Sequence, residues 1–253
     1  MKAIRVSAVS YANTVPFVYG IENSKVYEDI ELSFDVPSIC AEKLLTDKVD
    51  IGLVPVGIIP GLKEHYIISE YCIGAIGKVK TVLLASDVPL EQIQQVHLDS
   101  HSRTSNILVK VLSADYWKIN PVWLDPDGPF TPSKIRDNSA ALIIGDKTFH
   151  EAPRHRFVYD LAEEWFNFTK LPFVFACWVA NKPLPDDFIA RFDEALKFGL
   201  SHIEEAAQLA MNSQTRDVDI VDYLTHNINY DFDAEKQNAL KLFYNYAAGQ
   251  NLI

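Results

Sequence analysis

KTVLLASDVP (residues 80–89) and PFVFACWVANKP (residues 172–183) decide the predicted fold of this chain. Both stretches are apolar, and proline residues bound them. Short apolar runs that end at turn-forming residues are typical of buried strands. We interpret the two stretches as strands that cross between two lobes, so the chain should pass from a first lobe into a second lobe and back.

The region before the first crossing has the pattern of a small α/β unit. AIRVSAV (3–9), ELSFDV (31–36) and VDIGLVP (49–55) are predicted strands. A short helix should follow SYANTVP (10–16), and PSICAEKLLTD (37–47) is a predicted helix with proline in its first turn. This alternation of strands and helices predicts a mostly parallel sheet.

The region between the two crossings repeats this order. QVHLD (95–99), PVWLD (121–125) and SAALIIGD (139–146) are predicted strands, and SRTSNILVKVLSADYW (102–117) has apolar residues at helical spacing. The two regions are too different in sequence to be a clear repeat. Their shared order of elements nevertheless predicts two α/β lobes.

The residues after Pro185 are predicted to be wholly helical. Amphipathic patterns occupy residues 186–211, 218–226 and 233–248, and Asp233 is a suitable N-cap for the last of them. This segment could form a separate helical domain or pack back on the first lobe. We favour the second arrangement because no low-complexity linker sets the segment apart.

The predicted fold class is therefore α/β, with two lobes, two crossover strands between them and a helical C-terminal segment packed on the first lobe. Residues 1–80 and 181–253 should form the first lobe, and residues 81–180 the second. A chain of 253 residues is long enough for two lobes of ordinary size. The aromatic group Trp165, Phe173, Phe175 and Trp178 is interpreted as core and hinge packing.

The acidic composition limits the partners of the chain. Its formal net charge is −11, so we expect neither nucleic acid nor an anionic membrane as a partner. A small anionic ligand would have to be held by local donors. The oligomeric state stays open between monomer and dimer, because the C-terminal helices could support either.

Several features predict a cytoplasmic protein without a bound metal. The N-terminal stretch MKAIRVSAVSYANTVPF is interrupted by polar residues, unlike the apolar centre of a signal peptide. Cys40, Cys72 and Cys177 are odd in number and far apart, which fits free thiols in a reducing compartment. No His or Cys spacing indicates a metal site, since His150 and His155 are not four residues apart.

Polar turns follow the predicted strands at the edge where a ligand should bind. Ligands of open parallel sheets bind outside the carboxyl ends of the strands, and the turns there are residues 10–14, 36–38, 100–105 and 145–146. LDSHSRTSN (98–106) is the richest in hydrogen-bond donors. Helix capping explains one or two of its hydroxyls, whereas the whole group with Arg103 fits an anion site at a helix N-terminus.

Six stretches together resemble the chorismate dehydratases of the futalosine route to menaquinone. They are SYANTVPFVYG (10–20), DVPSICAEKL (35–44), VDIGLVP (49–55), LDSHSRTS (98–105), ALIIGD (141–146) and EEWFNFTKLPFVFACWVA (163–180). The resemblance implies the fold of the type II periplasmic solute-binding proteins. It also implies conversion of chorismate into 3-(1-carboxyvinyloxy)benzoate and water, with chorismate as the small-molecule substrate and no cofactor.

The resemblance also implies the roles of individual residues. It marks Asn13 as the catalytic donor. The expected substrate-binding residues are Ser10, Ser38, Thr81, Ser100, Ser102, Arg103, Thr104, Ser105, Gly145 and Asp146. The motifs contain no obvious His or Glu base, so the substrate's own enolpyruvyl carboxylate is a candidate for that role. His101 departs from the family's usual small hydroxyl residue.

Several of these residues have a purely structural alternative. Asn13 could be an ordinary turn residue or cap. Arg103 could pair with Asp99 or Asp125, and Thr81 could face either the cleft or the core.

Two other functions compete with the dehydratase. One is a solute-binding receptor for a small organic anion, although such a receptor normally needs a signal peptide or a lipid-anchored cysteine. The other is the sister enzyme 1,4-dihydroxy-6-naphthoate synthase, whose opening motif is of a different kind from SYANTVP.

Overall fold

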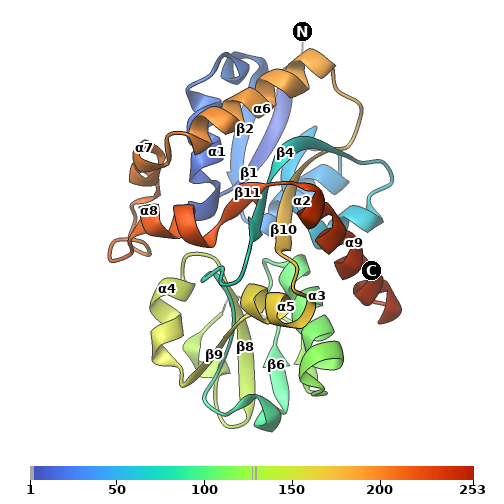
Figure 1. The fold of residues 1–253 in the computed structure, drawn as a ribbon, viewed down its shortest axis with the longest axis vertical. Coiled ribbons are helices and arrows are strands. Elements are labelled where there is room, and N and C mark those ends of the chain that lie inside the picture. The colour runs from blue at the N-terminus through green and yellow to red at the C-terminus, as the bar shows by residue number, and fades with distance from the viewer. Residues whose placement is uncertain (1–2, 127, 129) are drawn as a thin grey trace.

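Two β-sheets, one in each lobe, organise the chain (Figure 1). The computed structural model describes residues 3–126, 128 and 130–253. The first sheet has the strand order β11-β4-β10-β3-β1-β2 and the second has the order β7-β6-β8-β5-β9. The strands of the first sheet are β1 (Ile4–Val9), β2 (Ile30–Asp35), β3 (Ile51–Pro55), β4 (Tyr66–Ala75), β10 (Phe173–Ala180) and β11 (Asn229–Asp231). Those of the second are β5 (Val82–Ser86), β6 (Gln95–His97), β7 (Val122–Leu124), β8 (Ser139–Ile144) and β9 (Phe157–Asp160).

Helices flank both sheets. The α-helices are α1 (Val15–Glu22), α2 (Pro37–Leu45), α3 (Arg103–Val111), α4 (Thr148–Glu151), α5 (Leu161–Thr169), α6 (Asp186–Leu200), α7 (Ile203–Ala207), α8 (Ile220–Asp222) and α9 (Ala234–Gly249). Short 3-10 or π-helical turns are η1 (Ala12–Thr14), η2 (Lys25–Asp29), η3 (Val56–Gly61), η4 (Leu90–Gln92), η5 (Leu112–Trp117), η6 (Pro132–Lys134), η7 (Ala152–Arg154), η8 (Gln208–Ala210) and η9 (Tyr223–Asn227). Within the described residues, no helix is both long and apolar enough to cross a membrane.

The predicted strands are all present, but the sheets are mixed and not mostly parallel. β1 pairs in parallel with β2 and β3, and β6 pairs in parallel with β7 and β8. In contrast, β10 is antiparallel to β3 and β4, and β5 is antiparallel to β8 and β9. The reason is that β5 and β10 each follow a crossing from the other lobe. They therefore start at the edge of the sheet where the parallel strands end.

The chain crosses between the lobes at residues 76–81 and again at residues 170–172. Neither predicted crossover strand spans both lobes, because β5 lies wholly in the second sheet and β10 wholly in the first. The sequence-based division placed residues 173–180 in the second lobe, whereas their pairing puts them in the first sheet. We propose that the second lobe boundary lies at residues 170–172.

The C-terminal segment packs on the first lobe, but it is not wholly helical. β11 adds a strand to the first sheet beside β4, and it is too short to show an alternating pattern in the sequence. The long pattern at 186–211 divides into α6, α7 and η8. α6 packs along α1. α9 contacts β10 of the first lobe and α3 of the second lobe.

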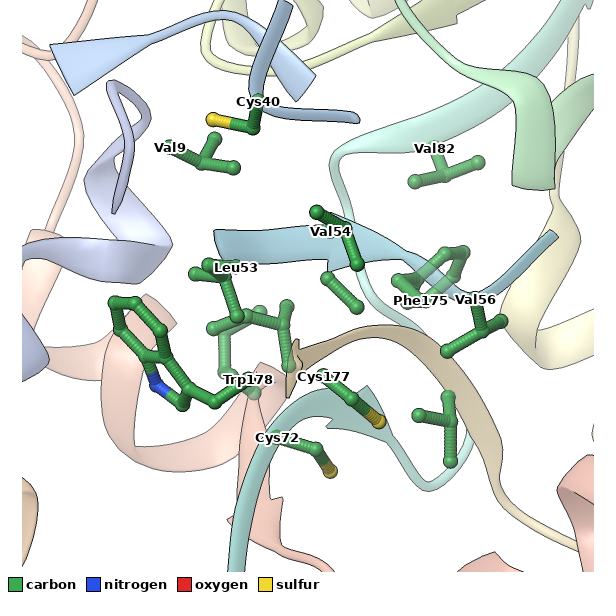
Figure 2. Packing of buried hydrophobic residues seen from close by; sticks show 14 of the residues in the cluster. Val9, Cys40, Leu53, Val54, Val56, Cys72, Val82, Phe175, Cys177 and Trp178 are labelled. Atoms are coloured by element: carbon green, nitrogen blue, oxygen red, sulfur yellow. The ribbon is translucent and has the colours of Figure 1, made fainter. Parts of the chain in front are cut away.

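The centre of the first lobe forms around β10. All of its residues are buried, and Figure 2 shows Cys177 and Trp178 of this strand near Leu53 and Val54 of β3. Trp178 contacts the edge of Phe192 from α6, with ring centroids 5.1 Å apart. This core fixes the position of the β10 start, which faces the second lobe.

Candidate functional site

A cavity lies between the two lobes. Its lining comes from both lobes and from the first crossing: Val9, Tyr11, Asn13, Thr14, Pro37, Pro55, Ile73, Val79, Thr81, Val82, Ser102, Thr104, Ser105, Ile144, Gly145, Phe175 and Ala176. Figure 2 labels three of its apolar side chains, Val9, Val82 and Phe175. The cavity lies at the carboxyl ends of β1, β3 and β8, where the sequence predicts the ligand.

Helix N-termini surround this cavity. Thr14 precedes α1, Pro37 begins α2, and Ser102 caps α3. Helix N-termini favour anions because their N–H groups and dipoles carry partial positive charge. Of the described residues that line the cavity, none is Asp, Glu, Lys, Arg or His. The lining therefore offers an anion hydroxyl, amide and helix-terminal donors without a formal cation.

Ser102 and Ser105 form a buried pair at the start of α3. Ser102 Oγ accepts a hydrogen bond from the Ser105 N–H at 3.1 Å, which is N-cap geometry. The same Ser102 hydroxyl donates to Ser105 Oγ at 2.7 Å. Because Ser105 accepts in this contact, its own hydroxyl hydrogen is available to a ligand in the cavity. Ser102 thus provides the helix cap, and the hydroxyl hydrogen of Ser105 is not used for capping.

The hydroxyl of Thr104 joins the lobes. Its Oγ1 accepts from the Gly57 N–H at 3.0 Å and donates to the Phe175 carbonyl at 3.3 Å. Gly57 lies in η3 and Phe175 in β10, so both partners belong to the first lobe. Thr104 lines the cavity, but its hydroxyl hydrogen is directed to the protein and not to a ligand.

Asn13 and Thr81 form a second polar wall. The Thr14 hydroxyl donates to Asn13 Oδ1 at 3.3 Å. Thr81 Oγ1 lies 2.9 Å from the hydroxyl of Tyr223, and both side chains are buried. Burial raises the pKa of Tyr223 well above its usual range, so this phenol stays protonated. Thr81 faces the cavity, which answers the question that the sequence left open.

Contacts between the segments that follow β1 and β8 join the two lobes at one side of the cavity. The Tyr11 ring packs on Gly145, where an added Cβ would lie 2.7 Å from Tyr11 Cζ. The Ala12 N–H donates to both carboxylate oxygens of Asp146 at 3.2 Å. Burial raises the pKa of Asp146 to about 6, although the Ala12 N–H acts in the opposite direction. Asp146 thus bridges the lobes and does not line this cavity.

Four other predicted residues also lie outside the cavity. Ser10 is exposed and lines, together with Asp146, a neighbouring hollow. Ser38 is half-buried next to Pro37, and Ser100 and Arg103 are exposed. His101 is also outside the cavity, and its N–H donates to Asp99 Oδ1 at 2.8 Å.

Helix geometry explains the position of Arg103. Successive side chains of an α-helix are about 100° apart, so a helix that turns Thr104 and Ser105 inward directs Arg103 outward. Asp99, one of its suggested partners, pairs instead with Lys147 at 3.1 Å. The predicted arginine-assisted anion site is therefore reduced to its hydroxyls and the helix terminus.

The sequence does not indicate two aromatic contributors to this site, whereas Thr14 belongs to the predicted polar turn at residues 10–14. Phe175 lines the cavity, although its sequence context predicts only core and hinge packing. Tyr223 comes from the C-terminal segment, where only an amphipathic pattern is visible. The one available signal is general, since a buried tyrosine hydroxyl usually has a hydrogen-bond partner. Within the described part of the chain, no group of three or more His, Cys, Asp or Glu side chains could hold a metal ion.

Comparisons with known proteins agree with this architecture. The chorismate dehydratase of Thermus thermophilus is 25% identical over 254 residues, which cover 92% of this chain and 91% of that protein. Protein AF1704 of Archaeoglobus fulgidus superposes with a TM-score of 0.77 at 18% identity, covering 100% of this chain and 99% of that one. The periplasmic aliphatic sulphonate binding protein SsuA of Escherichia coli superposes with a TM-score of 0.61 at 17% identity, covering 100% and 89%.

The structural likenesses confirm the predicted periplasmic-binding-protein fold. A family model described as menaquinone biosynthesis matches residues 4–249. Since this match includes both lobes and most of the C-terminal segment, the chain belongs to the menaquinone biosynthesis family.

Proposed function

We propose that this protein is a chorismate dehydratase, which eliminates water from chorismate and forms 3-(1-carboxyvinyloxy)benzoate. The observation that carries the proposal is the interlobe cavity, with hydroxyl and amide donors at helix N-termini and apolar side chains between them. Chorismate has one carboxylate on its small ring and a second on its enolpyruvyl ether, with apolar carbon atoms between them, and this lining matches that chemistry. The relationship to the Thermus thermophilus dehydratase supports the same substrate.

The elimination depends more on hydrogen-bond donors to the substrate than on strong acids or bases of the protein. The hydrogen on the carbon that bears the enolpyruvyl ether is vinylogous to the ring carboxylate. When that C–H bond breaks, its electron pair spreads through the ring onto this carboxylate. The electron pair then moves back into the ring and forms a new C=C bond. At the same time the neighbouring C–O bond breaks, hydroxide leaves with that bonding pair, and the ring becomes aromatic. Ser105 and the N-terminus of α3 would hold the ring carboxylate while charge accumulates there.

The proton acceptor is assigned to the substrate. Of the described residues that line the cavity, Tyr11 is the single titratable group, and burial raises its pKa far above the usual value. The enolpyruvyl carboxylate is tethered beside the departing hydrogen, so it can take the proton and give it to the leaving hydroxide. One proton and one hydroxide then make the water released. Asn13 would orient this carboxylate or the leaving hydroxyl, which makes it the catalytic donor.

The reaction is redox-neutral, so the proposed chemistry needs no cofactor. We place it in the cytoplasm, where the buried free thiols of Cys40, Cys72 and Cys177 would stay reduced.

Two parallel assays test the proposed function. The purified protein is incubated with chorismate in one and with a cyclic futalosine-type substrate in the other, and chromatography follows the products. Turnover of chorismate alone is the expected result. Turnover of the second substrate would instead indicate the sister synthase, and calorimetric binding of chorismate without turnover would indicate a receptor.

A further inference from the structure

Two tyrosines of the C-terminal segment hold the proposed catalytic residue. The Tyr230 hydroxyl donates to the backbone carbonyl of Asn13 at 3.0 Å. The Tyr223 hydroxyl contacts Thr81 Oγ1 at 2.9 Å and also interacts with the Asn13 side chain, which opposes the rise that burial causes in the Tyr223 pKa. Residues 220–231 therefore reach the cavity wall from behind, although Tyr223 itself does not line the cavity.

The contacts of Tyr223 form a continuous chain of donors and acceptors. Asn13 Oδ1 accepts from the Thr14 hydroxyl, which leaves the NH₂ group of this amide to donate to Tyr223 and to a ligand. At the other end, Thr81 Oγ1 also contacts the Val79 carbonyl at 3.4 Å. The Tyr223 hydroxyl can thus accept from Asn13 and donate to Thr81, which fixes both side chains at once.

The ring of Tyr223 is held independently of its hydroxyl. It packs edge-on against Phe149 of α4, with centroids 5.1 Å apart and an interplanar angle of 86°. Tyr223 is 1% exposed. The first lobe supplies this tyrosine and the second supplies Phe149, so this ring contact joins the two lobes.

We propose that Tyr223 is a positioning residue of the dehydration, whose hydroxyl, anchored on Thr81, orients the Asn13 amide towards the substrate. This inference rests on the proposed function. A displacement of about 1 Å at a reacting group can cost on the order of 100-fold in rate. Losing the hydroxyl should therefore slow the chemical step more than it weakens substrate binding.

Tyr223→Phe tests this role because it keeps the ring and removes one oxygen. We expect kcat for chorismate to fall about 10- to 100-fold while KM changes less than about threefold. In an Asn13→Ala background, the same substitution should cost less than about twofold, because the two residues act through one contact. The matched control is Tyr244→Phe, which removes a hydroxyl bonded to the Val56 carbonyl at 2.9 Å and should leave kcat unchanged.

The outcomes separate this inference from the proposed function. If Tyr223→Phe turns over chorismate with the same kcat as the unsubstituted protein, the positioning role is wrong, whereas the proposed function stands. The positioning role is also wrong if Tyr223→Phe lowers kcat by the same factor in the unsubstituted protein and in Asn13→Ala. Equal factors would show that the two residues act independently. An unsubstituted protein that does not turn over chorismate overturns the proposed function and the positioning role together.

Discussion

Ser105 is the side chain of the cavity whose hydroxyl is most clearly free to bind a ligand. Ser102 fulfils the capping role and donates to Ser105, so the Ser105 hydrogen remains available. The adjacent Thr104 has its hydroxyl engaged between Gly57 and Phe175. Neighbouring residues of one motif therefore have different tasks, which sequence spacing alone does not reveal.

Ser105→Ala should weaken binding of chorismate more than it slows the reaction. A hydrogen bond to a charged group is worth about 1.5–3 kcal/mol, so KM should rise roughly 10- to 100-fold. The contact exists in the ground state and strengthens as charge accumulates on the carboxylate, so kcat should also fall, by a smaller factor than KM rises. Steady-state kinetics measure both parameters, with Ser133→Ala at an exposed serine as control. A fall in kcat at unchanged KM would contradict the assignment.

Asp146 should make stability depend on pH in a specific direction. Its pKa is about 6 in the folded chain and 3.8 without burial. Between these values the folded chain binds more protons than the unfolded chain, so this group makes the protein less stable as pH rises. Asp146→Asn lacks that titration.

Urea unfolding from pH 4 to pH 7 measures this effect. The free energy of unfolding of the unsubstituted protein should fall relative to that of Asp146→Asn by about 2–3 kcal/mol across this range. Other titrating groups are common to both proteins and cancel in the difference. Parallel pH profiles would show that Asp146 has an ordinary pKa.

At the scale of elements, the sequence predicts well those strands that are buried and short. Residues 49–55 and 139–146 are continuous apolar runs, and both are central strands, β3 and β8. β4 escapes prediction because exposed residues such as Tyr66 and Glu70 interrupt its apolar pattern. β11 escapes because it depends on tertiary pairing with β4.

The same limit applies to the site. Hydroxyl-rich turns at strand ends predict the polar half of the cavity, including Asn13, Ser102 and Ser105. The direction of a side chain on its helix and the arrival of Tyr223 from a distant segment depend on packing. Local sequence therefore cannot distinguish the exposed Arg103 from the buried Ser105.

The turn after β8 should tolerate no side chain at residue 145. Gly145 has φ +75°, and an added Cβ would lie 2.7 Å from Tyr11 Cζ. Gly77 has φ +77° with nothing within 4 Å of an added Cβ. Both alanine variants should lose about 1–2 kcal/mol of unfolding free energy from the left-handed backbone. Gly145→Ala should lose more, because Tyr11 must move. Urea unfolding measures the loss for each variant. Equal losses for Gly145→Ala and Gly77→Ala would show that the Tyr11 contact does not restrict residue 145.

For the whole molecule, the two lobes touch on both sides of the cavity. Thr104 connects them through Gly57 and Phe175, while Asp146 connects them through Ala12. These contacts hold the two lobes against each other on either side of the cavity, as expected for a two-lobed protein whose lobes move about a hinge.

Product or a substrate analogue should draw the lobes together. Small-angle X-ray scattering of the free protein should give a larger radius of gyration than that of the complex, because donors on both lobes contact the ligand. Asn13→Ala, which keeps the binding serines, should close in the same way. Identical scattering profiles with and without a saturating ligand would mean that the cavity fills without lobe movement.

The most direct test of the account is the rate at which chorismate becomes an aromatic product lighter by one water. The unsubstituted protein should consume chorismate and form 3-(1-carboxyvinyloxy)benzoate in equal amounts, as measured by chromatography with mass detection. Asn13→Ala should bind chorismate with nearly normal affinity by calorimetry, yet its kcat should fall by on the order of 10²–10³ because a transition-state donor is lost. Equal rates for the two proteins, or binding of chorismate without product from either, would contradict dehydration in the interlobe cavity.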